Sequence, residues 1–263
     1  MRGVTIGPLR ALHWPASGRQ APQKLLAIHG VWVGAPVWNQ VGPYLASHGY
    51  ETYAVWLRHH QPGADPRQLA GLGLQDYADD VAAVVRDLGA PVLLGHSMGG
   101  LLAQLVATAT EPSGLALLAS APPFGIPVIP RLSLVVTSLR HFIGRPLSSR
   151  PMRPFADDAF LGRVSPGQRA ALTARRVPEP RRLARQLAFV PPIITASHVR
   201  CPVWVAGGDE DPVIRPWVTR RIAARYGVRP SIYRGGGHML NLESGWSSVA
   251  DDLIHWVERC VST

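Results

Sequence analysis

The chain has 263 residues, 46% of them hydrophobic, which is enough to bury the core of one large domain or of one domain with an insertion. No apolar run reaches the about 18 residues that a membrane-spanning helix needs, and residues 1–20 hold neither a continuous apolar stretch nor a clear cleavage site, so we expect a cytoplasmic protein without a transmembrane segment. The two cysteines, Cys201 and Cys260, are too few and too far apart for a disulfide framework.

Six short apolar runs are typical of buried strands, and amphipathic or apolar segments typical of helices lie between them. The first predicted helix has apolar residues at a spacing of three and four, namely Leu74, Tyr77, Val81, Val84 and Leu88. A second, apolar helix is expected over residues 99–110, and a last helix contains Val249 and Trp256. This alternation predicts the α/β class, with a mostly parallel β-sheet flanked by helices. The expected strands are 24–29, 50–56, 91–94, 115–119, 202–206 and 231–233.

Residues 122–195 interrupt the alternation and predict an inserted helical cap, so that 1–121 and 196–263 form the core. Helices are expected over a stripe from Leu132 to Ile143, over 168–176 and over 181–189, where Pro180 precedes the helix. Twelve arginines and three acidic residues lie between 124 and 197, so this segment holds most of the net charge of +10. It is either a solvated arginine surface or a cap that attracts anionic substrates or a membrane surface. No nucleic-acid-binding motif accompanies the charge.

A Gly-x-Ser-x-Gly pattern, Gly95 to Gly99, follows the third expected strand and opens a helix. A sharp strand-to-helix turn of this kind presents its serine, Ser97, beside the N–H groups and the positive dipole end of the helix. Serine is a weak nucleophile until a base removes its proton. His238, in a loop after the sixth strand, is the candidate base, and Asp211, after the fifth strand and before a proline, is the candidate acid, with Asp209 as its main rival.

An oxyanion would need two N–H donors, for which the backbone of Met98 and that of Val31 are the candidates. Met98 follows the nucleophile, and Val31 follows His29 and Gly30 at the end of the first expected strand. We further expect Trp32, His96 and Met239 to line the substrate pocket, with core packing as the alternative for each. His59 and His60 could also line it, although a structural role is the more usual one for histidines in a polar loop.

At these residues the chain resembles the α/β-hydrolase fold superfamily, in its branch of esterases and lysophospholipase-like serine hydrolases. The resemblance covers nearly the whole length and includes "LLAIHGVW", "LLGHSMGGLLAQLVA", "VWVAGGDEDPVI" and "GGGHMLNLE". The family's spacing before proline also implies Asp211 as the acid. The loop after 50–56 departs from the family, because it reads "RHHQPG" where a Gly-His-Gly-x-Ser pattern is usual.

The sequence therefore predicts a serine hydrolase that cleaves carboxylic esters of small molecules or lipids, lactones and thioesters included, through an acyl-enzyme and without a metal or organic cofactor. An anionic substrate and a lipid substrate are both open, as is the oligomeric state. A carbon–carbon bond hydrolase, or a lyase or cyclase on the same fold, is the alternative. A non-catalytic ligand-binding member is less favoured, because the apparent triad is intact. A serine at the elbow argues against the dehalogenase and epoxide hydrolase branches, which use aspartate there.

Overall fold

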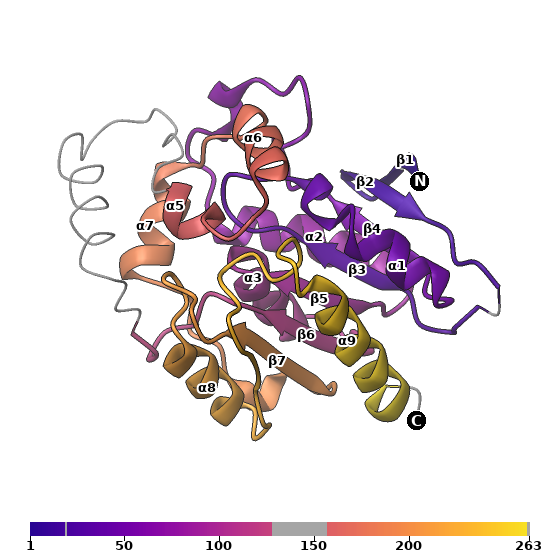
Figure 1. Cartoon of the computed structure of the whole chain (residues 1–263). Helices are drawn as coiled ribbons and strands as arrows, with labels where there is room; N and C mark the ends of the chain where they lie inside the picture. Colours follow the sequence, from indigo (N-terminus) through magenta and orange to yellow (C-terminus); the bar gives the residue numbers. More distant parts are fainter. Residues whose placement is uncertain (19, 128–156, 262–263) are drawn as a thin grey trace.

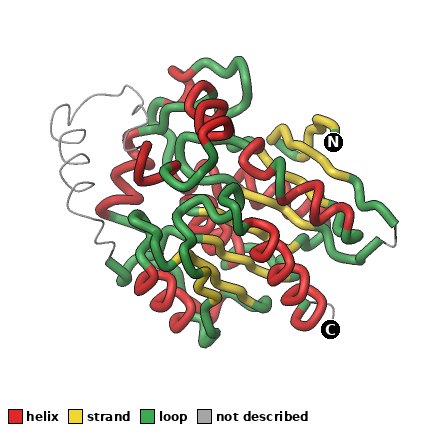
Figure 2. The backbone as a smooth tube through the Cα atoms, in the orientation of Figure 1, coloured by secondary structure: helices red, strands yellow, loops and turns green. Residues whose placement is uncertain are grey.

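A computed structural model describes residues 1–18, 20–127 and 157–261 of the chain. One eight-stranded sheet runs through the molecule, in the order β1-β2-β4-β3-β5-β6-β7-β8 (Figures 1 and 2). Strands β3 to β8 pair in parallel with one another, whereas β2 pairs antiparallel with both β1 and β4. The strands are β1 (Arg2–Ile6), β2 (Leu9–Trp14), β3 (Leu25–Ile28), β4 (Thr52–Val55), β5 (Val92–His96), β6 (Gly114–Leu118), β7 (Val203–Gly208) and β8 (Ser231–Tyr233).

All six strands predicted from the sequence are present, as β3 to β8, and the prediction of a mostly parallel sheet with flanking helices is confirmed. The central strands are apolar throughout because both faces are covered. On β3, Leu26 and Ile28 pack on one face and Leu25 and Ala27 on the other. Strands β1 and β2 were not predicted. They form a hairpin whose turn holds Gly7 at a φ of 52°.

Helices cover the two faces of the sheet in separate sets. One core contains apolar side chains of α2 (Leu74–Leu88), α3 (Met98–Ala107) and α8 (Pro216–Arg225). The opposite core contains those of α1 (Val41–Ser47) and α9 (Trp246–Cys260). Short 3-10 helices cover 35–38, 66–69 and 196–198. None of the helices in the described ranges has the length and apolar character needed to cross a membrane.

Between β6 and β7 the described residues form α5 (Asp157–Leu161), α6 (Pro166–Ala174) and α7 (Arg181–Phe189), which lie together at one side of the sheet (Figure 1). Helix α7 has the predicted bounds, and α6 begins two residues earlier than predicted because Pro166 occupies its first turn. Helix α5 was not predicted. The helix expected from Leu132 to Ile143 lies outside the described residues, and the division into core and cap stays a prediction.

Candidate active site

Ser97 lies at the turn between β5 and α3 in a strained backbone conformation, with φ 54° and ψ −120°. Close packing explains the glycines around it. A Cβ at Gly95 would lie 2.4 Å from the Gly99 carbonyl oxygen, and a Cβ at Gly99 would lie 2.3 Å from that of Ile28. Side chains at either position would push α3 away from the strands, so the turn can form only with glycine there.

Hydrogen bonds to the neighbouring strand hold this conformation in place. The Ser97 N–H donates to the Leu118 carbonyl at the end of β6 (3.1 Å), and the Ser97 carbonyl accepts from the Ala121 N–H (2.9 Å). The nucleophile candidate is therefore fixed on both sides by main chain, and its side chain is the part left free to react.

The structure brings Ser97, His238 and Asp211 into one hydrogen-bonded chain. His238 Nε2 lies 3.1 Å from Ser97 Oγ, and His238 Nδ1 lies 2.9 Å from Asp211 Oδ2. Asp211 Oδ1 accepts the N–H groups of Val213 (2.7 Å) and Ile214 (2.9 Å), which fixes the carboxylate. With Nδ1 donating to Asp211, Nε2 is the nitrogen that can accept the serine proton. All three residues are buried.

The rival acid, Asp209, points elsewhere, since its Oδ1 accepts the Gly235 N–H at 2.7 Å. This bond is one of several that join the acid loop to the histidine loop. The N–H groups of Asp209 and Glu210 donate to the carbonyls of Tyr233 (3.1 Å) and Gly236 (2.9 Å). A Cβ at Gly208 would lie 2.2 Å from the Gly236 carbonyl oxygen, so the two loops are in direct backbone contact.

Glu243 holds the histidine loop from the other side, and sequence reasoning did not assign it a role. Its carboxylate is buried and accepts the N–H groups of Gly237 (2.6 Å) and Met239 (2.9 Å), the two residues that flank His238. An acidic residue five positions after the histidine was the available signal. Glu243 thus orients the main chain that carries the candidate base.

Two further buried histidines support the site without acting as bases. Burial, reinforced by the nearby His238, lowers the pKa of His96 to about 3, and its Nε2 donates to the His238 carbonyl at 2.9 Å. Burial, with a contribution from His60, likewise lowers the pKa of His29 to about 3. His29 Nδ1 donates to the Gly30 carbonyl (2.8 Å), while Nε2 accepts the Leu57 N–H (3.2 Å). Both rings stay neutral at physiological pH and fix loops around Ser97.

The two predicted oxyanion donors belong to two separate segments next to Ser97. Met98 is the first residue of α3, and Val31 lines the same pocket as Ser97. The loop before Val31 approaches closely, because a Cβ at Gly30 would lie 2.9 Å from Ser97 Cβ. Neither N–H donates to an acceptor within the part of the chain that the structure describes, so both can donate to a ligand.

The loop after Val31 is held by a buried carboxylate from the segment between β6 and β7. Trp32 has a φ of 63°, and its N–H donates to Glu179 Oε1 at 2.7 Å. The same oxygen lies 3.0 Å from His60 Nε2. Burial of His60 opposes protonation, but the charge and hydrogen bond of Glu179 outweigh it, so the pKa of His60 is raised. His60 is therefore structural and His59 is partly exposed, and neither lines the pocket.

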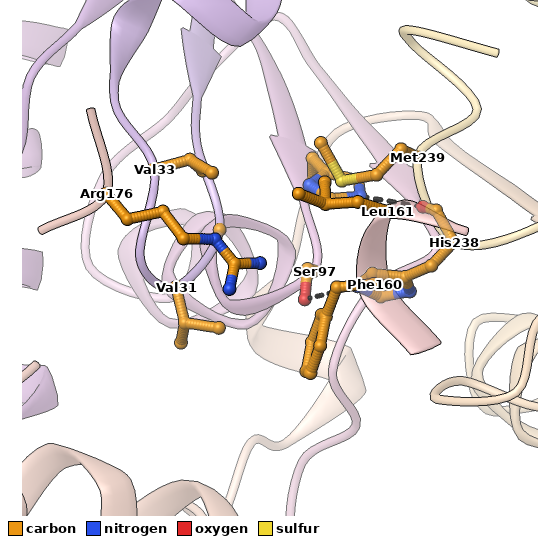
Figure 3. A pocket seen from close by; sticks show the side chains of 10 residues that line it. Val31, Val33, Ser97, Phe160, Leu161, Arg176, His238 and Met239 are labelled. Carbon is orange, nitrogen blue, oxygen red and sulfur yellow. Dashed lines mark hydrogen bonds between the residues drawn. The ribbon is translucent and has the colours of Figure 1, made fainter. Parts of the chain in front are cut away.

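Two parts of the chain line the pocket in front of Ser97 (Figure 3). The sheet side contributes Val31, Val33 and Met239 as well as His96, and the segment between β6 and β7 contributes Phe160, Leu161 and Arg176. Trp32 does not line it; its ring packs edge-on against Phe160, with the centroids 5.1 Å apart. Within the described ranges, no group of three or more histidine, cysteine or acidic side chains is arranged to hold a metal ion.

Residues 25–252 match the model of the alpha/beta hydrolase family. This chain belongs to the alpha/beta hydrolase family. This alpha/beta hydrolase is similar to the solved structure of a monoglyceride lipase variant from Saccharomyces cerevisiae in complex with a substrate analogue. The TM-score is 0.77 at 16% identity, over all of this chain and 96% of that one.

Two curated proteins match shorter stretches of this alpha/beta hydrolase. A pyrethroid hydrolase from Sphingobium wenxiniae is 35% identical over 77 residues, which are 29% of this chain and 27% of that protein. A polyneuridine aldehyde esterase from Rauvolfia serpentina is 33% identical over 94 residues, which are 34% of each chain. The aligned stretches thus span about a third or less of these relatives.

Proposed function

We propose that this alpha/beta hydrolase is a serine hydrolase that cleaves carboxylic esters, with Ser97 as nucleophile, His238 as general base and acid, and Asp211 as the residue that orients and stabilises His238. The chain of two hydrogen bonds from Ser97 Oγ through His238 to Asp211 carries the proposal. The names of the two curated relatives, a hydrolase and an esterase, agree with it.

In the proposed reaction His238 Nε2 takes the Ser97 proton as Oγ attacks the acyl carbon. Asp211 stabilises the imidazolium, because its Oδ2 faces Nδ1 and its Oδ1 is already saturated by two N–H donors. The alcohol leaves with the proton from His238, and an acyl-enzyme remains on Ser97. Water then attacks the acyl-enzyme by the same route, which releases the acid and restores the serine hydroxyl.

In this proposal, the N–H groups of Val31 and Met98 donate hydrogen bonds to the negative oxygen of each tetrahedral intermediate. Met98 also brings the positive end of the α3 dipole to this oxygen. Donors of this kind contribute about 3 kcal/mol each to transition-state stabilisation. Because Gly30 contacts Ser97 so closely, the distance between the Val31 N–H and the Ser97 hydroxyl is fixed by the main chain.

We also propose that residues 122–195 act as the cap of this site. The support is that Phe160, Leu161 and Arg176 come from this segment and line the same pocket as Ser97. On this proposal, the core residues supply the reaction and the cap residues that line the pocket select the substrate. The mostly apolar walls would contact the apolar parts of a small-molecule ester.

A fluorophosphonate probe, which reacts with activated serines, tests the nucleophile. We expect the native protein to be labelled, Ser97→Ala not to be labelled, and His238→Ala to be labelled about 10²–10⁴ times more slowly. His48→Ala removes an exposed histidine far from Ser97 in the chain and should label like the native protein. Labelling that persists in Ser97→Ala contradicts the assignment of the nucleophile.

A panel of nitrophenyl esters from acetyl to palmitoyl, with lactones and a lysophospholipid, tests the reaction. Hydrolysis of at least one ester, lost in Ser97→Ala, supports the proposal. Probe labelling together with no hydrolysis across the panel would instead favour carbon–carbon bond cleavage or lyase chemistry on the same triad.

A further inference from the structure

Arg176 places a guanidinium in the pocket that the proposed ester hydrolysis does not use. Its side chain is 5% exposed and lines the pocket together with Ser97 and His238. Figure 3 shows the guanidinium reaching from the side of Val31 toward Ser97. The oxyanion is assigned to backbone N–H groups, and proton transfer is assigned to His238. Burying a cation in this pocket has a desolvation cost, so the position of Arg176 in the pocket of Ser97 suggests that its charge serves a purpose.

Only some of the N–H groups of the Arg176 guanidinium donate hydrogen bonds to protein groups. Nη1 pairs with Asp157 of α5, and the guanidinium carbon lies 5.7 Å from the centroid of the Trp32 ring. Nε is buried and has no hydrogen-bond partner among the residues that the structure describes. Burial lowers the pKa of Arg176 and Asp157 acts against this, but a guanidinium stays charged in either case.

The edge of the guanidinium that carries Nε and Nη2 is therefore the edge left for a ligand. Two parallel N–H groups on such an edge match the two oxygens of a carboxylate. The surrounding walls strengthen the contact, since Val31, Val33, Phe160 and Leu161 are apolar and exclude competing water. Of the described residues that line the pocket, Arg176 alone carries a permanent positive charge.

We propose that Arg176 binds a carboxylate of the substrate, so that the enzyme prefers esters carrying a free carboxylate a few bonds from the scissile carbonyl. The inference rests on the proposed ester hydrolysis and gives its substrate class. Asp157 pairs with Nη1, away from the edge left for the ligand, so it holds Arg176 in place while its negative charge weakens the attraction of the guanidinium for a substrate carboxylate. The net positive charge of residues 124–197 adds long-range attraction for such anions.

Paired substrates test the preference. Monoethyl glutarate carries the carboxylate on the acyl side, and 4-butanoyloxybutanoic acid carries it on the alcohol side. Each is compared with its primary amide and with its N,N-dimethylamide, which are neutral, still accept hydrogen bonds and add no second ester. We expect kcat/KM for at least one acid to exceed that of both neutral forms by about 10- to 100-fold, the range of a hydrogen bond to a charged group. Equal rates for the acid and the amide would overturn a site for an anion.

Variants assign the preference to Arg176. Arg176→Met should lower kcat/KM for the acid by about 10- to 100-fold and reduce the rates of the neutral esters much less. Asp157→Asn removes the negative charge beside the guanidinium but keeps an acceptor oxygen for Nη1, and it should raise kcat/KM for the acid several-fold, a gain that misfolding would not produce. Arg169→Met is the matched control, because Arg169 pairs with Asp158 in the same segment but does not line the pocket.

Loss of the acid preference in Arg169→Met to the same extent as in Arg176→Met would overturn the inference in favour of general attraction by the basic surface. So would a native enzyme that hydrolyses the neutral esters as fast as the acids. These results differ from a failure of the proposed function, in which no ester is hydrolysed and Ser97 is not labelled by the probe.

Discussion

Replacing Glu179 by alanine should destabilise the fold and slow the reaction together, because one carboxylate oxygen serves two buried partners. Glu179 Oε1 accepts the Trp32 N–H at 2.7 Å and meets His60 Nε2 at 3.0 Å, and both side chains of the pair are at most 1% exposed. Removing one member of a buried pair costs about 3–5 kcal/mol. That is a large part of the roughly 5–15 kcal/mol by which domains are stable.

The effect on catalysis follows from the position of Trp32, one residue after Val31. In Glu179→Ala the Trp32 N–H loses its carboxylate acceptor while its φ of 63° remains strained, so we expect the loop to relax and the Val31 N–H to move away from the proposed oxyanion position. Loss of one oxyanion donor costs about 10²–10³ in kcat, which is the upper limit for Glu179→Ala. Glu179→Gln keeps an acceptor oxygen and should lose less activity.

Urea unfolding followed by tryptophan fluorescence measures the stability, and ester hydrolysis measures kcat. Glu111→Ala is the control, because Glu111 is exposed and lies 3.7 Å from Arg200, a surface pair worth at most about 1 kcal/mol. A cost below about 1 kcal/mol for Glu179→Ala, or a kcat equal to that of the native enzyme, would refute the reasoning.

The remaining predictions concern the residues around Ser97. Gly30→Ala places a Cβ 2.9 Å from Ser97 Cβ, and we expect kcat to fall at least about tenfold, with circular dichroism unchanged. The pKa values of His29 and His96 are about 3, below the ordinary 6.5, so folding stability should be lost as the pH falls below 6.5, by about 2 kcal/mol for each histidine at pH 5. Urea unfolding between pH 7.5 and 5 checks this, and a flat profile contradicts it. Glu243→Gln replaces one of two acceptor oxygens beside His238, and a fall in kcat with little change in KM is expected.

The sheet and the turn that carries the candidate nucleophile could be predicted because their signals are local. Strands β3 to β8 are buried on both faces and therefore read as continuous apolar runs. Ser97 follows β5, Asp211 follows β7 and His238 follows β8, and the carboxyl ends of parallel strands share one edge of the sheet. Residues that follow strands can therefore meet there, although they are far apart in the sequence.

The missed elements lack such signals. Strand β1 is mostly exposed, and α5 has only five residues, too few for a helical period. Glu179 and Arg176 belong to a segment whose sequence predicts α6 and α7 but not how these helices pack on the sheet. Their contacts with Trp32 depend on that packing, so neither role could be inferred from spacing.

The main-chain bonds between the acid loop and the histidine loop bear on how this enzyme can be altered. Because the N–H groups of Asp209 and Glu210 donate to carbonyls of the histidine loop, part of the contact between the two loops does not depend on side chains. Gly208 and Gly236 touch directly, and the Asp209 carboxylate accepts the Gly235 N–H, so these three residues have to stay. A mutant library that fixes them together with Glu179, and varies the residues of the proposed cap that line the pocket, would sample new substrates with the proposed triad in place.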